Sequence, residues 1–191
     1  MGRVSQAKAQ ENRSRVVDTA SRLFREQGTQ VSVADLMKAA GLTHGAFYKQ
    51  FASKEALVDE ATAHAFAELA RRYTERLERY EGRRDAAQQA LIDTYLSVEH
   101  RDDPADGCPV AALATDIARE GGGREGGGRE ARRVYAEGVA DFTDFLATDD
   151  QDGIVRLCTL FGALVLSRAT KGSPLSEEIL AAAHAALTEA G

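Results

Sequence analysis

The sequence predicts an all-α protein with two helical domains, a small one at the N-terminus and a larger one after it. Apolar residues recur at helical spacing along most of the 191-residue chain. Alternating runs of β-branched or aromatic residues, which would indicate strands, are absent from the sequence. Only three prolines interrupt it. We place the boundary so that the N-terminal domain covers 1–55 and the C-terminal domain covers 56–191.

Helix-ending residues define the first two helices. The first helix ends at Gly28, because glycine adopts the left-handed conformation of a helix end without strain. Ser32 and Asp35 have the spacing of a capping box, with Asp in place of Glu, and start a second helix that ends at Gly41. The apolar stripe of the first helix consists of Val16, Val17, Ala20, Leu23 and Phe24.

The third and fourth helices each follow a hydroxyl residue. We expect Thr43 to cap a short helix over 44–51. We expect Ser53 to cap a long helix that reaches Tyr80.

The remaining helices are separated by polar or glycine-rich stretches. A fifth helix is predicted over 84–99, followed by an acidic loop at 101–107 and a sixth helix that begins at Pro109. The tandem repeat GGGREGGGRE at 121–130 predicts a flexible connection. The last three helices are predicted at about 131–146, 153–170 and 176–190.

The charge is unevenly distributed. The chain carries a formal charge of −6, but residues 1–54 hold nine Lys and Arg against four Asp and Glu. A basic N-terminal domain on an acidic body suggests that only this domain meets a polyanion, although chance asymmetry is the alternative. Two cysteines are too few for a disulfide framework. No signal peptide or membrane-length apolar segment is present in the sequence, so we expect a cytoplasmic protein that does not bind membranes.

Residues 32–51 have the pattern of a helix-turn-helix. Two short helices are joined by a glycine-containing turn. Small residues, Ala39 and Ala40, allow the two helices to cross closely, and Leu42 can fill the corner between them. The second of these helices is too short to be stable alone, which suits a recognition element held on a scaffold.

Residues 41–61, GLTHGAFYKQFASKEALVDEA, resemble the signature of the TetR family of transcriptional regulators. The resemblance is strong over about residues 10–65 and architectural after that. It implies an all-helical homodimer whose larger C-terminal domain binds a small-molecule inducer and releases operator DNA. The positions that carry it are Gly41, Thr43, Gly45, Phe47, Tyr48, Phe51, Lys54, Glu55 and Leu57.

The resemblance implies a role for each exposed position of the third helix. Thr43 and Tyr48 would hold phosphates of double-stranded DNA, and Lys49 and Lys54 would add charge to the same contact. Base edges would be faced by His44, Gly45 and Ala46, with Gln50 as a weaker candidate. The pair Lys49-Gln50 departs from the family, which often has an aromatic residue or His before Phe51. The alternative is that this face is only a solvated corner of two helices.

The C-terminal domain offers an apolar helix for self-association and a set of possible pocket residues. Residues 154–166 are apolar on more than one side, which indicates burial in a core or at an interface. In the family the last two helices pair with their copies in a homodimer, and an ordinary core is the alternative. A ligand pocket among the fourth to seventh helices could be lined by Phe66, Leu69, Tyr73, Leu91, Tyr95, Leu113, Ile117, Tyr135 and Phe142.

Cys108 is a candidate sensing residue. It directly precedes Pro109, so it would occupy the N-cap of the sixth helix, where the helix dipole lowers the pKa of a thiol. The segment is similar to one found in some TetR-type sensors of electrophiles. A small buried residue is the alternative interpretation. Cys158, on an apolar helix, is expected to be inert.

The sequence does not favour an enzyme. The four histidines lie apart, and neither metal-ligand spacing nor a phosphate-binding glycine loop is present, so we expect no cofactor, no metal and no catalytic residues. His64 has Glu60 and Glu68 one turn away on either side, a pattern typical of a solvated helix face. The best interpretation is a DNA-binding regulator, and an interaction protein with the same fold is the third alternative.

Overall fold

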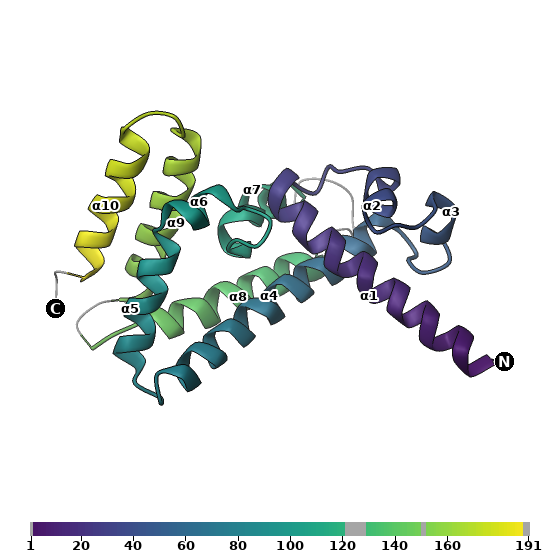
Figure 1. The fold of residues 1–191 in the computed structure, drawn as a ribbon, viewed down its shortest axis with the longest axis horizontal. Helices are drawn as coiled ribbons and strands as arrows, with labels where there is room; N and C mark the ends of the chain where they lie inside the picture. Colours follow the sequence, from purple (N-terminus) through teal and green to yellow (C-terminus); the bar gives the residue numbers. More distant parts are fainter. Residues whose placement is uncertain (1, 121–128, 150–151, 189–191) are drawn as a thin grey trace.

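The computed structural model describes residues 2–120, 129–149 and 152–188. Within these residues the protein consists of ten helices and no strands, so the predicted all-α fold is confirmed. The arrangement is elongated, and the two ends of the chain lie at opposite ends of the molecule (Figure 1). None of the helices in this described part is long and apolar enough to cross a bilayer.

The N-terminal end is built from α1 (Gly2–Gln27), α2 (Val33–Ala39), α3 (His44–Phe47) and the start of α4 (Lys54–Arg79). We call residues 2–61 the head and the rest of the described chain the body. α3 is a single turn, shorter than the helix expected over 44–51. Beyond it the chain turns to enter α4, and the Phe51 N–H donates to the carbonyl of Phe47 at 2.9 Å.

The body contains the long part of α4 and six further helices. They are α5 (Arg84–Tyr95), α6 (Val98–Asp102), α7 (Pro109–Glu120), α8 (Arg129–Leu146), α9 (Gly153–Ala169) and α10 (Leu175–Thr188). α4 and α8 run side by side along the molecule, and α9 and α10 form the end farthest from the head (Figure 1).

The structure corrects two predictions of helix boundaries. The single helix expected over 84–99 is two helices, because Ser97 has an extended backbone and its hydroxyl accepts a hydrogen bond from the His100 N–H at 3.1 Å, which starts α6. α6 also continues into the loop expected at 101–107. Residues 121–128 of the glycine-rich repeat lie outside the described residues, but the end of the repeat, Arg129 and Glu130, already belongs to α8.

Two hydrophobic cores fill the molecule. The body core gathers buried residues of α4, α5, α7, α8, α9 and α10 around Phe142, Leu146, Leu160 and Leu164. The head core is not confined to the head, because α7 and α8 contribute to it as well. Since α4 begins at Lys54 and passes without a break through residue 55, one helix serves both cores. The domain boundary at residue 55 therefore stays a prediction.

Candidate DNA-binding head and ligand cavity

Main-chain and side-chain hydrogen bonds hold α2 and the turn that follows it. Gly41 has a φ of +70°, which glycine adopts without strain. The next N–H, that of Leu42, donates to the carbonyl of Met37 at 2.8 Å. At the other end of α2, the Ser32 hydroxyl accepts a hydrogen bond from the Asp35 N–H at 3.1 Å. The predicted cap and glycine turn are confirmed, and together they fix where α3 begins.

α3 is held in place by its buried side. Phe47 is 1% exposed and stacks on Phe51, with ring centroids 5.4 Å apart. The guanidinium of Arg13, on α1, lies 4.4 Å from the centre of the Phe51 ring. It also donates hydrogen bonds to the carbonyl of Gln50 and to the carboxylate of Glu60. One arginine therefore connects α1, the end of the helix-turn-helix and α4.

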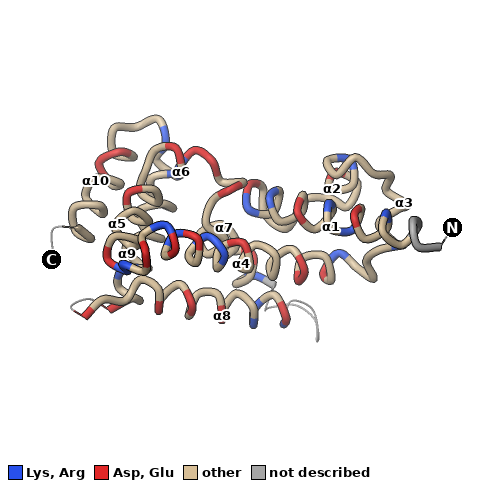
Figure 2. Tube along the Cα trace, turned by 60° about the horizontal axis from the view of Figure 1, so that its bottom comes forward, with Lys and Arg blue, Asp and Glu red and all other residues tan. Residues whose placement is uncertain are grey.

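The other side of α3 faces solvent. Five of the seven residues predicted to contact DNA are exposed together there, namely Thr43, His44, Gly45, Tyr48 and Lys49. Tyr48 is 65% exposed, and its ring stands edge-on to that of His44 at 5.6 Å. Ala46 and Lys54 are half-buried. Lysine and arginine positions lie on α2 and beside α3 at this end of the molecule (Figure 2).

The expected hydroxyl cap at Thr43 is wrong. Thr43 does occupy the N-cap of α3 with an extended backbone, but its side chain makes no capping hydrogen bond. The Ala46 N–H donates instead to the main-chain carbonyl of Thr43, at 2.9 Å. Ser53 does cap α4, because its hydroxyl accepts from the Ala56 N–H at 3.1 Å.

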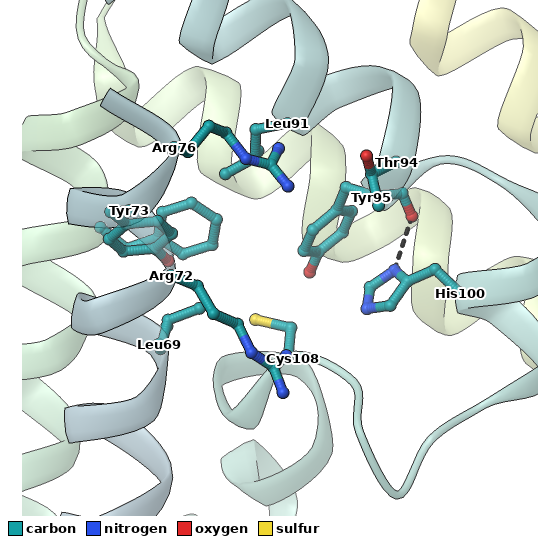
Figure 3. A pocket seen from close by; sticks show the side chains of 10 residues that line it. Leu69, Arg72, Tyr73, Arg76, Leu91, Thr94, Tyr95, His100 and Cys108 are labelled. Carbon is teal, nitrogen blue, oxygen red and sulfur yellow. Dashed lines mark hydrogen bonds between the residues drawn. The ribbon is translucent and has the colours of Figure 1, made fainter. Parts of the chain in front are cut away.

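A cavity that is partly open to solvent lies in the body. α4 supplies Tyr73 and Arg76 to its wall, and α5 supplies Tyr95. His100 of α6 and Cys108, at the start of α7, complete the polar part of the lining. Figure 3 shows these side chains converging from α4, α5, α6 and the residue before α7.

The two tyrosines of the cavity are neutral donors. The Tyr73 ring stacks on those of Phe142 and Phe145, with centroid distances of 5.0 and 4.7 Å. Burial raises the pKa of Tyr73 and that of Tyr95 far above the usual range for a phenol. Both hydroxyls therefore keep their protons at neutral pH.

Cys108 precedes the first residue of α7, as predicted, but its thiol is not activated. Burial raises the pKa of the Cys108 thiol. This outweighs the lowering effect of the Ala111 N–H and the Tyr95 hydroxyl. The expectation of a lowered pKa is therefore wrong: the helix start acts in the expected direction, but a side chain only 4% exposed is protonated at neutral pH. Cys158, in contrast, is exposed on α9.

The structure brings together only some of the residues predicted to line a pocket. One cavity is lined by Cys108 and by five of the predicted residues, namely Leu69, Tyr73, Leu91, Tyr95 and Phe142. Leu113 and Ile117 lie in the head core and do not line it, because they are on the part of α7 that packs against the head.

Phe66 and Tyr135 lie on α4 and α8, nearer the head than the cavity residues of these helices. Phe66 lines a second hollow between these helices, together with Tyr73. The Tyr135 ring packs edge-on against Phe66, with centroids 5.6 Å apart. Its hydroxyl donates to the carbonyl of Val110 at 2.7 Å, so Tyr135 connects α8 to the start of α7.

Polar contacts join the wall of the cavity to the head. The Asp116 carboxylate of α7 accepts a hydrogen bond from the Thr29 N–H, just after α1, at 2.7 Å. In the loop before α7, Asp106 binds Arg22 of α1 through its carboxylate. The main-chain carbonyl of Asp106 accepts from Arg72 of α4 at 2.8 Å. These contacts connect α7 and the loop before it to α1 and the residues just after it.

His64 has a different neighbour from those expected. The Asp18 carboxylate lies 3.6 Å from its Nε2, whereas Glu60 pairs with Arg13. Asp18, His64 and Glu68 bring one potential ligand atom each to within 4.8 Å of one another. Glu68 also binds Arg25 at 3.4 Å, so its charge is already balanced, and we interpret the group as an ion-pair network.

Three residues of this arrangement were missed by the sequence analysis. Arg76 lies three positions after Tyr73, on the same face of α4, and that spacing could have indicated it. Asp116 interrupts the apolar stripe of α7, which is also a usable signal. His100 has no such signal, because its place depends on the break between α5 and α6.

Comparison with known proteins identifies the head. Residues 16–61 match the family described as bacterial regulatory proteins, tetR family. The chain is also 43% identical over 61 residues to the HTH-type transcriptional regulator AcrR of Shigella flexneri. The head therefore matches the TetR family of bacterial regulatory proteins. The alignment with AcrR spans 31% of this chain and 28% of that relative, so the likeness to it covers the head and little of the body.

Solved structures extend the likeness to the body. E. coli NemR in its reduced form superposes with a TM-score of 0.75 at 20% identity, over 94% of this chain and 96% of that one. A TetR-family regulator from Cytophaga hutchinsonii gives 0.72 at 17% identity, over 95% and 96% of the chains. AibR, solved in complex with isovaleryl coenzyme A and operator DNA, gives 0.60 at 15% identity, over 92% and 97%. These likenesses show a shared fold.

Proposed function

We propose that this protein is a transcriptional regulator that binds operator DNA as a homodimer and acts as a repressor that a small molecule or an electrophile releases. The observation that carries this proposal is the exposed face of α3 on a helix held by the buried Phe47. A short helix supported in this way can enter the major groove of DNA, which is about 12 Å wide.

The exposed residues divide into two kinds of contact. Thr43 and Tyr48 offer hydroxyls, and Lys49 and Lys54 offer charge, for contacts to phosphates that position the head. His44 can donate to a base edge, with Gly45 and Ala46 beside it. Nothing lies within 4 Å of a Cβ added at Gly45, so this side of α3 is open to a close approach by DNA.

Gel shifts with the DNA upstream of the protein's own gene test this function. We expect a palindromic footprint, because two-fold symmetry presents two α3 helices, and an affinity that falls steeply with salt. His44→Ala should change the preference among operator variants, whereas Tyr48→Phe should weaken all of them alike. Binding that ignores salt, or no binding, would favour an enzyme or a protein-interaction role. A reporter behind the bound promoter should become more active when the gene is deleted; lower activity would make the protein an activator.

The homodimer is supported by the outer face of α9. Ile154, Val155, Val165 and Leu166 are exposed there, although they are apolar. The sequence analysis treated residues 154–166 as one apolar surface, but the structure separates two faces, and Leu164 is fully buried in the chain's own core. An exposed row of this kind, on a helix at the end of the molecule, suits contact with a second copy.

Light scattering on full-length variants tests the dimer. We expect Leu166→Arg to give folded monomers with weak operator binding, because it places a charge on the exposed apolar row. Ala136→Arg, on an exposed position of α8, is the matched control and should remain dimeric. A dimeric Leu166→Arg protein would place the interface elsewhere.

Release through the cavity follows from its connections. α4 lines the cavity and begins next to α3, while α7 joins Cys108 to the contact between Asp116 and Thr29. The structural neighbour AibR, whose structure holds isovaleryl coenzyme A together with operator DNA, supports a fold that accommodates a small molecule and DNA. The protonated state of Cys108 favours a non-covalent ligand over thiol chemistry.

Operator release by N-ethylmaleimide distinguishes release by modification of Cys108 from release by a non-covalent ligand. A thiolate adds to the carbon–carbon double bond of the maleimide, forming a C–S bond, and the neighbouring carbon takes a proton from water. If Cys108 is a sensor, wild type and Cys158→Ser should release DNA, and Cys108→Ser should not. If wild type, Cys158→Ser and Cys108→Ser all release DNA alike, Cys108 is only a packing residue.

A further inference from the structure

The cavity of the body has an unbalanced charge. Of the described residues that line it, two are arginines, Arg72 and Arg76, and none is acidic. Arg72 is exposed, and one of its nitrogens donates to the carbonyl of Asp106. Arg76 is half-buried, and its guanidinium points into the cavity between the walls formed by α4 and α5 (Figure 3).

Arg76 lacks the partners that other sheltered arginines of the body have. Its Nη1 is buried and makes no hydrogen bond within the described chain. Arg101, in contrast, binds Asp102 and Ser176, and Arg168 donates to two main-chain carbonyls. Burial lowers the pKa of Arg76, but a guanidinium remains charged at neutral pH. A sheltered cation without a partner is unfavourable, and an anion in the cavity would relieve it.

A neutral donor lies one turn before this cation on α4. The Tyr73 hydroxyl is buried and has no hydrogen-bond partner in the described part of the chain. Tyr95, on the facing wall, points its hydroxyl toward the Cys108 sulfur and has no nitrogen or oxygen partner there (Figure 3). The Tyr73 phenol keeps its proton and can donate to a carboxylate that also pairs with the guanidinium of Arg76.

The rest of the cavity is apolar. Leu69, Leu91 and Phe142 line it together with the tyrosine rings. A ligand therefore needs an apolar body as well as a charged end.

We propose that the cavity binds an organic carboxylate, with its carboxylate on Arg76 and the Tyr73 hydroxyl and its apolar body against Leu91 and the Tyr95 ring. This assignment rests on the proposed function, because it names the class of molecule that would act as the effector. His100 adds no charge to the site. Burial lowers its pKa, and the neutral ring bonds through Nδ1 to the carbonyl of Tyr95 at 2.7 Å.

Matched probes test the proposal on the full-length protein. Benzoate, benzamide and benzyl alcohol share a ring and differ in charge, and their binding can be measured by calorimetry and by the shift in Tm. We expect wild type to prefer benzoate over benzamide by about tenfold or more, since a hydrogen bond to a charged group contributes more than one to a neutral group. Arg76→Gln should abolish this preference while benzamide still binds. Arg79→Gln, an exposed arginine of the same helix, is the control and should retain it.

A second variant keeps the test independent of any folding defect in Arg76→Gln. Tyr73→Phe retains the ring that stacks on Phe142 and removes only the hydroxyl, so it should weaken benzoate more than benzyl alcohol. Equal affinity of wild type for benzoate and benzamide would overturn the proposal. So would a benzoate preference that survives in Arg76→Gln, or the failure of benzoate, cinnamate and octanoate all to bind wild type.

Operator binding without any probe is measured in parallel. A protein that binds the operator but does not distinguish benzoate from benzamide would refute the ligand class and leave the regulator function intact. Selective benzoate binding without operator binding would support the carboxylate site and refute the regulator function.

Discussion

Thr43, Tyr48 and Lys49 of the head point away from the core and are exposed. Tyr73 and Arg76 of the body point into a cavity. Both groups combine hydroxyls with a cation, which is the chemistry that binds oxyanions. An outward group can contact an extended partner such as a duplex, whereas an inward group can contact only a molecule small enough to enter. The position of the core relative to the side chains thus decides which ligand the same residue types can bind.

One helix joins these two regions. α7 has Cys108 just before it in the cavity, and it contributes Leu113 and Ile117 to the head core. Asp116, between them on the same helix, binds the Thr29 N–H after α1. Packed helices move as units, so we expect a ligand that displaces the start of α7 to act on the head as well. The difference between the two regions can be tested on the exposed face of α3, at the contact between α7 and the head, and in the cavity.

The largest effect is expected from Phe47→Ala. Phe47 is 1% exposed and holds a helix of a single turn, so its removal should lower the free energy of unfolding by about 3–5 kcal/mol. Urea unfolding followed by circular dichroism measures the loss. The exposed neighbour is the control: Tyr48→Ala should keep the stability of wild type and lose operator affinity. If both variants unfold like wild type, the head does not depend on this packing.

Asp116→Ala should have a smaller effect at the junction. Thr29 is 3% exposed, and its N–H would be left without an acceptor, which costs about 1–3 kcal/mol. The matched control is Thr115→Ala, an exposed position on the same helix that should cost almost nothing. Equal midpoints of urea unfolding for the two variants would show that this hydrogen bond does not hold α7 to the head.

Features set by neighbouring residues could be predicted from the sequence. The cap formed by Ser32 and the glycine turn at Gly41 depend on residues within one turn of each other, and the structure has both. The exposed face of α3 was predicted as well, because a helix with Phe47 and Phe51 inward leaves the intervening polar side chains outward.

Features set by packing could not be predicted in the same way. The position of Cys108 before Pro109 was correct, but its pKa depends on burial by other helices, and that effect outweighs the helix start. Leu113 and Ile117 lie on the apolar face of α7, and they were predicted to line the pocket. They belong to the head core instead, because the positions of α1 and α4 decide which core this part of α7 packs into. The break at Ser97 also escaped prediction, because the apolar pattern continues across it.

The reactivity of the two cysteines tests how closed the cavity of the body is. Cys158 is exposed in the single chain, on the α9 face of the proposed dimer contact, whereas Cys108 is buried and burial raises its pKa. In the monomeric Leu166→Arg variant, a thiol reagent such as DTNB should therefore modify Cys158 first. As the pH rises toward the raised pKa, more Cys108 thiolate forms and its labelling should accelerate. Rates measured on Cys158→Ser and Cys108→Ser separate the two sites. Faster labelling of Cys108 at neutral pH would mean that the cavity opens readily and that the thiol is more accessible than its burial indicates.

The smallest effect is expected at the outward side, from Lys49→Ala. Lys49 is exposed beside α3, so its removal should leave folding unchanged and free one DNA phosphate in each protomer from its cationic partner. The slope of log affinity against log salt should decrease by about one for each phosphate that is no longer neutralised, and all operator sequences should be affected alike. Lys171→Ala removes an equal charge next to Asp102, far from the head, and should leave the slope unchanged. A slope that changes equally in both variants would mean that net charge, and not the face of α3, governs DNA binding.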